Sequence, residues 1–213
     1  MLTIFQSPKG GSGTTVTAAS YALATAEHHG KAMLIDMCGD SRAVLGMADT
    51  DAPGLNDWLG ESHHAGADAL IGSGTAVENG LLVVHPGTRF VTGAPRWEAL
   101  AGALSSWDFP VIVDAGTHFV PEEIRAMAGN NWLVTRACYL SLRRATRMPR
   151  PTGAVVIKEQ GRALTVRDVE AVLNVHVVAT IQVDPAVARA VDAGVLPARN
   201  GELLGAHLPP VGP

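Results

Sequence analysis

The sequence predicts an α/β fold of three layers, in which helices cover both faces of a mainly parallel sheet of about seven strands. Two observations predict this fold. Short apolar runs alternate with helical stretches along the chain, and a glycine-rich loop joins the first run to the first helical stretch. The runs are apolar throughout, as is usual for parallel strands that are buried on both faces.

The first strand is expected at residues 2–5, directly before the glycine-rich loop. Six more apolar runs predict the other strands, at residues 32–36, 81–84, 111–114, 132–135, 154–157 and 177–180. Helices are expected over residues 14–24, 95–106, 121–129, 138–148, 165–173 and 185–193. Residues 37–80 are less regular. No linker divides the chain, so we expect one domain over residues 1–213, with residues 205–213 as a loose tail.

The composition sets bounds on the function. A chain of 213 residues can bury a sizeable core. Hydrophobic residues make up 47% of the chain and aromatic residues only 5%, which indicates a largely aliphatic core. The net charge of −4 gives no general indication of nucleic-acid binding. No apolar run approaches the ~20 residues that cross a membrane.

The N-terminus and the cysteines suggest a cytoplasmic location. Met1 leads straight into the first strand without a secretory signal, and Cys38 and Cys138 lack a metal-binding spacing. Two such thiols are typical of a reducing compartment. We interpret the His28–His29 and His63–His64 pairs as surface residues.

The loop between the first strand and the first helix is the strongest functional signal. It comprises Gly10, Gly11, Ser12 and Gly13, and Thr14 and Thr15 follow it. Glycines let backbone N–H groups turn inward, and the helix N-terminus favours negative charge, so the loop suits a phosphate. The Thr15 hydroxyl suits Mg²⁺. The alternative is a glycine-rich turn that only packs strand against helix; the threonine pair and Lys9 favour phosphate binding.

Residues Lys9-Gly10-Gly11-Ser12-Gly13-Thr14-Thr15 resemble the deviant Walker A motif of the ParA/MinD ATPases, K-G-G-x-G-K-[ST]. Threonine in place of the second lysine is most similar to the CpaE/TadZ-like branch. The resemblance implies a P-loop NTPase fold and binding of ATP with Mg²⁺. It also implies a nucleotide-linked homodimer, in which Lys9 reaches the nucleotide of the partner subunit. Thr14 removes the second lysine's contact with the phosphates of its own subunit.

Two of the predicted strands end in an aspartate. Parallel strands place their carboxyl ends at one edge of a sheet, so we expect these aspartates at the same edge as the glycine-rich loop. Asp36 ends the second strand and resembles the first aspartate of the family's V-D-x-D motif; its alternative role is a helix N-cap. The second, water-orienting aspartate of that motif is replaced by Cys38, and Asp40 is a substitute only if the loop rearranges. Asp114 ends a later apolar strand and is our predicted carboxylate on the magnesium side.

Val183 and Asp184 lie in a segment that resembles the family's last motif, which packs around the nucleotide base. Gln182 replaces the proline of that motif. Ile157-Lys158-Glu159 stands where the family often has an Asn-Arg pair that reads adenine, so the base specificity is left open.

A basic segment covers residues 136–150 and contains five arginines and no acid. Arg143 and Arg147, four residues apart, share one side of a predicted helix with Arg144 adjacent. Such a patch suits DNA phosphates or an acidic partner, and the alternative is a solvated helix face. Residues 202–213 carry no lysine or arginine, so direct membrane binding is not expected.

The favoured hypothesis is a ParA/MinD-like switch that dimerises around ATP and Mg²⁺ and recruits a protein partner. Its cargo would be a chromosome or plasmid, a division site or a pilus. Hydrolysis would be slow or absent, because the residues at positions 14 and 38 depart from the motif. The alternative is a non-hydrolysing scaffold that acts through dimer and partner binding alone. A phosphate-binding enzyme of another α/β class fits Lys9-Gly10-Gly11 less well.

Overall fold

The computed structural model describes residues 1–60, 66–89 and 95–212. Within these ranges the strands form one eight-stranded sheet in the order β3-β4-β2-β5-β1-β6-β7-β8. All neighbours pair in parallel except β3, which is antiparallel to β4. The strands are β1 Leu2–Gln6, β2 Ala32–Asp36, β3 Thr75–Ala76, β4 Leu81–Val84, β5 Val111–Gly116, β6 Asn130–Arg136, β7 Gly153–Lys158 and β8 Val177–Gln182.

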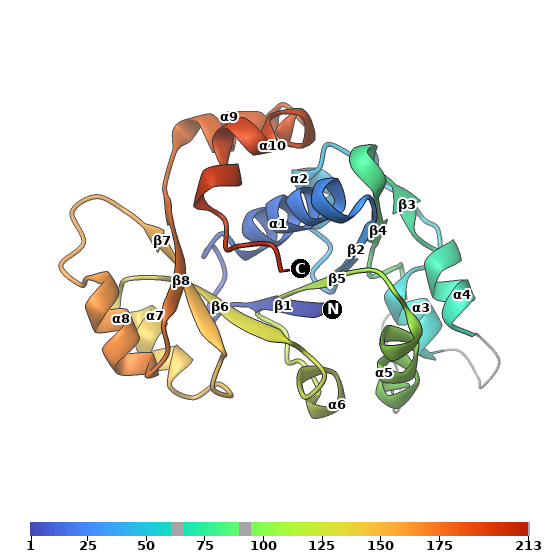
Figure 1. The fold of residues 1–213 in the computed structure, drawn as a ribbon, viewed down its shortest axis with the longest axis horizontal. Helices are drawn as coiled ribbons and strands as arrows, with labels where there is room; N and C mark the ends of the chain where they lie inside the picture. Colours follow the sequence, from blue (N-terminus) through green and yellow to red (C-terminus); the bar gives the residue numbers. More distant parts are fainter. Residues whose placement is uncertain (61–65, 90–94, 213) are drawn as a thin grey trace.

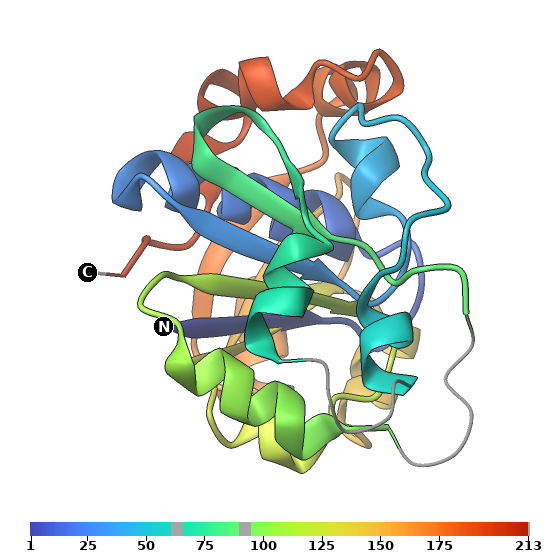
Figure 2. The same cartoon turned by 90° about the vertical axis from the view of Figure 1, so that its right-hand side faces the viewer.

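Helices cover both faces of this sheet, so the predicted three-layer α/β fold is confirmed (Figures 1 and 2). One face carries α1 Thr14–His29, α2 Ser41–Val44, α9 Pro185–Asp192 and α10 Leu196–Leu203. The other carries α3 Leu55–Gly60, α4 Ala67–Gly72, α5 Trp97–Ser106, α6 Glu122–Arg125, α7 Tyr139–Ala145 and α8 Val166–Leu173. Two short 3₁₀ turns, Glu78–Gly80 and Gly205–His207, complete the described elements.

Side chains alternate between the two faces of the sheet along each strand, so each face has its own hydrophobic core. In β1, Phe5 faces the core under α1, whereas Ile4 faces the core under α3 to α6. Phe5 meets Tyr21 of α1 and Trp132 of β6, with ring centroids 5.3–5.4 Å apart. This aromatic cluster holds α1 on the sheet, and so positions the loop that joins β1 to α1.

All seven predicted strands are confirmed, and the sequence missed only the two-residue strand β3 among those described. Three short helices, α2, α3 and α4, lie in the stretch that looked irregular, and α10 was also not predicted. Helices of four to six residues present too few turns for a clear apolar period, which explains why they were missed. The His63–His64 pair lies outside the described residues.

The C-terminal segment differs from the expected loose tail over residues 205–212, while Pro213 lies outside the described residues. The Tyr21 hydroxyl donates to the carbonyl of Pro210 at 3.3 Å, and a His29 ring nitrogen lies 3.0 Å from the carbonyl of Gly212. Leu208 and Val211 pack against the core under α1. The tail therefore lies against α1, and the chain ends beside its own beginning (Figure 1). The division of the chain into one domain stays a prediction.

Among the described residues, no helix combines the length and the apolar character needed to cross a lipid bilayer.

Candidate functional site

The glycine-rich loop lies between β1 and α1, and it is open to solvent. Gly11 and Gly13 have φ of 71° and 84°, in the left-handed region that glycine adopts without strain. The backbone N–H groups of Gly10, Gly11 and Gly13 meet no acceptor within the part of the chain that the structure describes. Because water alone can satisfy these donors, the loop is ready to accept an anion.

Short hydrogen bonds hold the shape of this loop. The Ser12 hydroxyl donates to the carbonyl of Lys9 at 2.8 Å, and the backbone N–H of Ser7 donates to the carbonyl of Gly116 at 2.6 Å. The second bond ties the loop to the end of β5. Thr14, the first residue of α1, is buried, whereas Thr15 is partly exposed and lines the cavity beside the loop.

Asp114 lies at the end of β5 and carries an unmet hydrogen-bond acceptor. Its side chain is fully buried; Oδ1 accepts from the backbone N–H of Gly116 at 3.1 Å, and Oδ2 has no partner among the described residues. Burial raises the pKa of Asp114 to about 7, against the lowering effect of the nearby Thr15 hydroxyl. The structure therefore brings together the two residues predicted on the magnesium side. A buried carboxylate oxygen without a donor suits a cation.

Asp36 is as buried as Asp114 and pairs with it in the register of β2 with β5. Unlike Asp114, it has hydrogen-bond donors for both of its carboxylate oxygens. Its Oδ1 accepts from the backbone N–H groups of Cys38 and Gly39 at 2.8 and 2.9 Å. Its Oδ2 accepts from the N–H of Ser41 at 2.9 Å, at the start of α2. These bonds use both oxygens and hold the loop between β2 and α2. The N-cap residue of α2 is Asp40, so the alternative role of Asp36 as a helix N-cap is wrong.

Cys38 follows β2 and lines the cavity beside the glycine-rich loop. Its Sγ lies 3.7 Å from the carbonyl oxygen of Asp114 and 3.7 Å from Nδ1 of His118. Burial, followed by the charges of Asp114, Asp36 and Asp40, raises the pKa of this thiol. The thiol is therefore neutral near pH 7 and cannot act as a general base.

Asp40 lines the same cavity from an exposed position before α2, and its side chain makes no capping hydrogen bond. His118 and Thr117, which follow β5, complete the wall together with Val191 and Asp192 of α9. None of these four residues is among the predicted site residues. The cavity measures about 720 Å³, a size that admits a nucleotide.

A smaller, more apolar cavity of about 340 Å³ adjoins it and shares Gly13, Val16, Val191 and Asp192. Val183 and Asp184, predicted on the base side, line this second cavity. Asp184 also caps α9, because its Oδ1 accepts from the N–H of Ala186 at 2.7 Å. The apolar surface is supplied by Val16, Ile157, Ile181, Val187 and Leu204.

Lys9 does not line either cavity. Its Nζ donates to the carbonyl of Gly10 at 3.2 Å, and its charge lowers the pKa of Glu159 after the larger effects of Arg162 and Arg136. The side chain thus lies on the outside of its own loop, toward the segment that follows β7.

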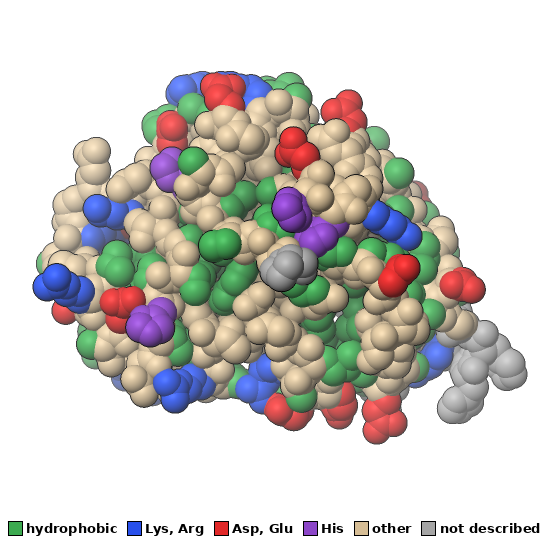
Figure 3. Space-filling view, in the orientation of Figure 1, with side chains coloured by type: hydrophobic (Ala, Val, Ile, Leu, Met, Phe, Trp, Pro, Cys, Tyr) green, Lys and Arg blue, Asp and Glu red, His purple; other side chains and the backbone are tan. Residues whose placement is uncertain are grey.

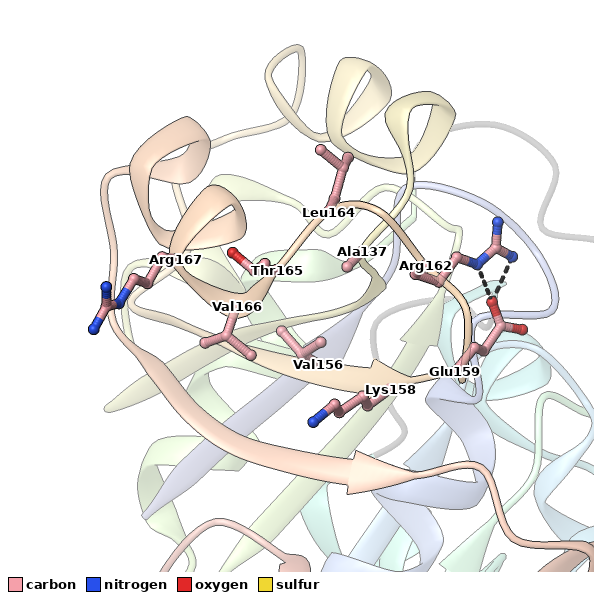
Figure 4. Close-up of a pocket in the computed structure, with 9 residues that line it drawn as sticks. All are labelled: Ala137, Val156, Lys158, Glu159, Arg162, Leu164, Thr165, Val166 and Arg167. Carbon is pink, nitrogen blue, oxygen red and sulfur yellow. Dashed lines mark hydrogen bonds and ion pairs between the residues drawn. The ribbon is translucent and has the colours of Figure 1, made fainter.

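A third cavity of about 490 Å³ lies on the opposite face of the sheet, between β7 and α8 (Figure 4). Glu159 and Arg162 form an ion pair at its rim, and Val156, Leu164 and Val166 line its interior. It contains none of the predicted site residues.

The predicted basic patch lies on and after α7. Arg143, Arg144 and Arg147 are exposed, and their guanidinium groups have no partner within the described residues. Tyr139 and Leu140, at the start of the same helix, are 71% and 48% exposed. On the side of α7 and α8, the face seen in Figure 3 carries Lys and Arg side chains with acidic and His side chains among them.

No family model matches this sequence, and no curated protein does either. Solved structures do resemble the fold. A ParA family ATPase from Chlorobium tepidum TLS superposes with a TM-score of 0.78 at 20% identity, covering 96% of this chain and 95% of that chain. The septum site-determining protein MinD with Mg-ADP from Pyrococcus horikoshii OT3 has a TM-score of 0.66 at 17% identity, covering 95% and 90%. A Cyanothece McdA variant in complex with ATP has a TM-score of 0.66 at 15% identity, covering 96% of each chain.

Identities of this size establish the fold alone: the chain has the P-loop fold of the ParA/MinD-type ATPases. Its placement in the CpaE/TadZ-like branch, and the roles of the predicted site residues, stay predictions.

Asp36 and Asp40 allow a direct test of how much the Asp36 hydrogen bonds stabilise the loop before α2. We expect Asp36→Ala to lower the free energy of unfolding by roughly 2–4 kcal/mol, because three backbone donors lose a charged acceptor. Asp40→Ala is the control and should stay within about 0.5 kcal/mol, because its side chain is exposed and makes no capping bond. Urea unfolding measures both values. Equal losses in the two variants would contradict this structural role of Asp36.

The pKa of Asp114 predicts a dependence of stability on pH. The folded chain keeps a proton up to about pH 7 that the unfolded chain releases near the ordinary value of 3.8. Between these values the free energy of unfolding should fall as pH rises, by up to about 1.4 kcal/mol per pH unit from this group. Asp114→Asn should remove that contribution. The free energy of unfolding of the variant should therefore rise relative to that of the natural protein as the pH increases between these two values. Thermal unfolding without nucleotide, repeated across this pH range, tests the prediction. Stabilities that change with pH in parallel for the two proteins would refute it.

Proposed function

We propose that this protein is a ParA/MinD-like nucleotide switch that binds ATP with Mg²⁺ and dimerises around it. The observation that carries the proposal is the unpartnered, buried Oδ2 of Asp114 beside the glycine loop, with the Thr15 hydroxyl close by. A magnesium ion would satisfy that oxygen, and the free N–H groups of Gly10, Gly11 and Gly13 would receive phosphate oxygens.

The residues present fit this group of ligands in two further respects. The open cavity beside the loop is large enough for the phosphates, and the adjoining apolar cavity suits a nucleobase. Val183 and Asp184 line this apolar cavity, which supports their predicted place beside the base. Lys9 lies outside its own cavity, which supports a role toward the nucleotide of a partner subunit.

Hydrolysis should be slow. The neutral thiol of Cys38 stands where the family has a water-orienting carboxylate, and Asp36 is engaged by backbone donors. Asp40 lines the cavity and is the remaining carboxylate for such a role. The alternative function is a scaffold that no longer turns nucleotide over, and the neutral Cys38 thiol is the observation that favours it.

The exposed Arg143, Arg144 and Arg147 provide a surface for a partner. Non-specific DNA phosphates and an acidic protein both suit it. Solved structures that share the fold include a MinC:MinD cell division protein complex from Aquifex aeolicus. A positioning role in partition, division or pilus placement is the corresponding proposal for this chain.

Thr14→Lys tests how the loop holds phosphate. We expect the variant to bind ATP with Mg²⁺ roughly 10–100-fold more tightly, because a lysine at this position adds a charge-assisted hydrogen bond to the phosphates. Isothermal titration calorimetry measures the affinity. Ala43→Lys, which adds the same charge at an exposed position of the cavity wall, should change the affinity far less. Unchanged affinity in Thr14→Lys contradicts the assignment of the loop, and absence of ATP binding in the natural protein favours the scaffold.

Lys9→Ala tests the proposed role in the dimer. Light scattering should show that ATP and Mg²⁺ double the mass of the natural protein. We expect Lys9→Ala to lose most of this dimer while it retains ATP binding, because Lys9 does not line its own cavity. Lys31→Ala is the control, since Lys31 lies over the Phe109 ring at the other end of the sheet. Loss of ATP binding together with the dimer would instead place Lys9 at its own nucleotide.

A further inference from the structure

The cavity between β7 and α8 has an aliphatic interior (Figure 4). Ala137 and Val156 are buried, and Leu164 and Val166 pack against the same hydrophobic cluster while they keep part of their surface open to solvent. The volume of about 490 Å³ lies in the range of small-molecule sites. A hydrocarbon chain in this cavity would remove the open apolar surface from water, which is favourable.

The charged side chains around this cavity leave positive charge free. Lys158, Arg162 and Arg167 line it against a single acid, Glu159. Both oxygens of that carboxylate are engaged, because Oε1 pairs with Arg136 and Oε2 accepts from Nε of Arg162 at 2.6 Å. Lys158 and Arg167 have no charged or hydrogen-bonded partner among the described residues. A charged ligand of this cavity is therefore expected to be an anion.

The neutral polar side chain in the lining, Thr165, is already in use. Its hydroxyl donates to Oδ2 of Asp168 at 2.7 Å and accepts from the N–H of Asp168 at 3.3 Å, in the capping box of α8. The lining side chains therefore recognise a ligand through aliphatic contact and through charge.

Lys158 is the cation best placed to meet an anion bound here. It follows Val156 by two residues on β7, so the two side chains share one face of the sheet. Figure 4 shows Lys158 beside Val156, whereas the guanidinium group of Arg167 lies at the opposite end of the cavity from the Glu159–Arg162 pair.

We propose that this cavity binds a medium-chain aliphatic carboxylate. Its hydrocarbon chain packs on Val156, Leu164 and Val166, and its carboxylate pairs with the Lys158 ammonium group. A concave site of this volume suits a free small molecule. The cavity shares no lining residue with the two cavities assigned to the nucleotide, so the proposal does not rest on the proposed function.

Sodium octanoate is the probe, and octanamide is its uncharged match. Backbone amide NMR spectra of the full-length, nucleotide-free protein near pH 7 should show saturable shifts at residues 156–167 with octanoate. Octanamide should bind roughly 3–10-fold more weakly, because it lacks the ion pair with Lys158. Lys158→Met, which keeps an aliphatic stem without the charge, should lower the octanoate affinity by the same factor and leave the octanamide affinity unchanged. Lys31→Met is the matched control, since Lys31 lies over the Phe109 ring and outside this cavity.

Val166→Asp is the second test, because it places a negative charge in the apolar lining at the first residue of α8. An acid in the first turn favours a helix, so the fold should be retained, and circular dichroism checks this. The octanoate affinity should fall by at least roughly 10-fold. Val172→Asp on the same helix is the control, because Val172 is 46% exposed and does not line the cavity.

Three results would overturn the proposal: no saturable shifts at residues 156–167, equal affinities for octanoate and octanamide, or an octanoate affinity that neither Lys158→Met nor Val166→Asp lowers. A Glu-Leu-Glu peptide with blocked ends that shifts these signals when octanoate does not would also overturn it, in favour of a protein partner. ATP is absent from every titration, so a protein that binds ATP but not octanoate contradicts this site alone.

Discussion

The parallel pairing of β5 with both β1 and β2 is the constraint on which the rest of the site depends. Phe5 pairs with Asp114 on one side, and Asp36 pairs with Asp114 on the other. Because the three strands run in the same direction, the glycine loop, Asp114 and Cys38 follow their carboxyl ends at one edge. The bond from the Ser7 N–H to the Gly116 carbonyl then ties the loop to β5.

This arrangement places two carboxylates in the core with different surroundings. Asp36 receives three backbone hydrogen bonds and shapes the loop before α2. Asp114 receives one, and its second oxygen has no donor among the described residues. An unpaired buried carboxylate costs stability, which is why its pKa rises and why a cation would stabilise it. Asp36 therefore has a structural role, whereas Asp114 keeps one carboxylate oxygen free for a ligand.

Much of the fold was predictable, because parallel strands that are buried on both faces appear as uninterrupted apolar runs, and seven such runs became strands. The short helices between residues 41 and 72 carry too few turns for a clear period. The contacts of residues 205–212 with α1 were not predictable either. They rest on hydrogen bonds from Tyr21 and His29 to carbonyls roughly 180 residues away, and no local pattern records such pairs.

The sequence by itself determined the order of strands and helices, the glycine loop with Lys9 and Thr15, and an aspartate at the end of two strands, because these follow from local residue types and spacing. Only the tertiary structure decided what each aspartate does. Whether a carboxylate caps a loop or keeps a free oxygen depends on which backbone donors surround it after folding. The same holds for Cys38: its distance from His118 is set by how β2 and β5 lie side by side, 80 residues apart in the chain.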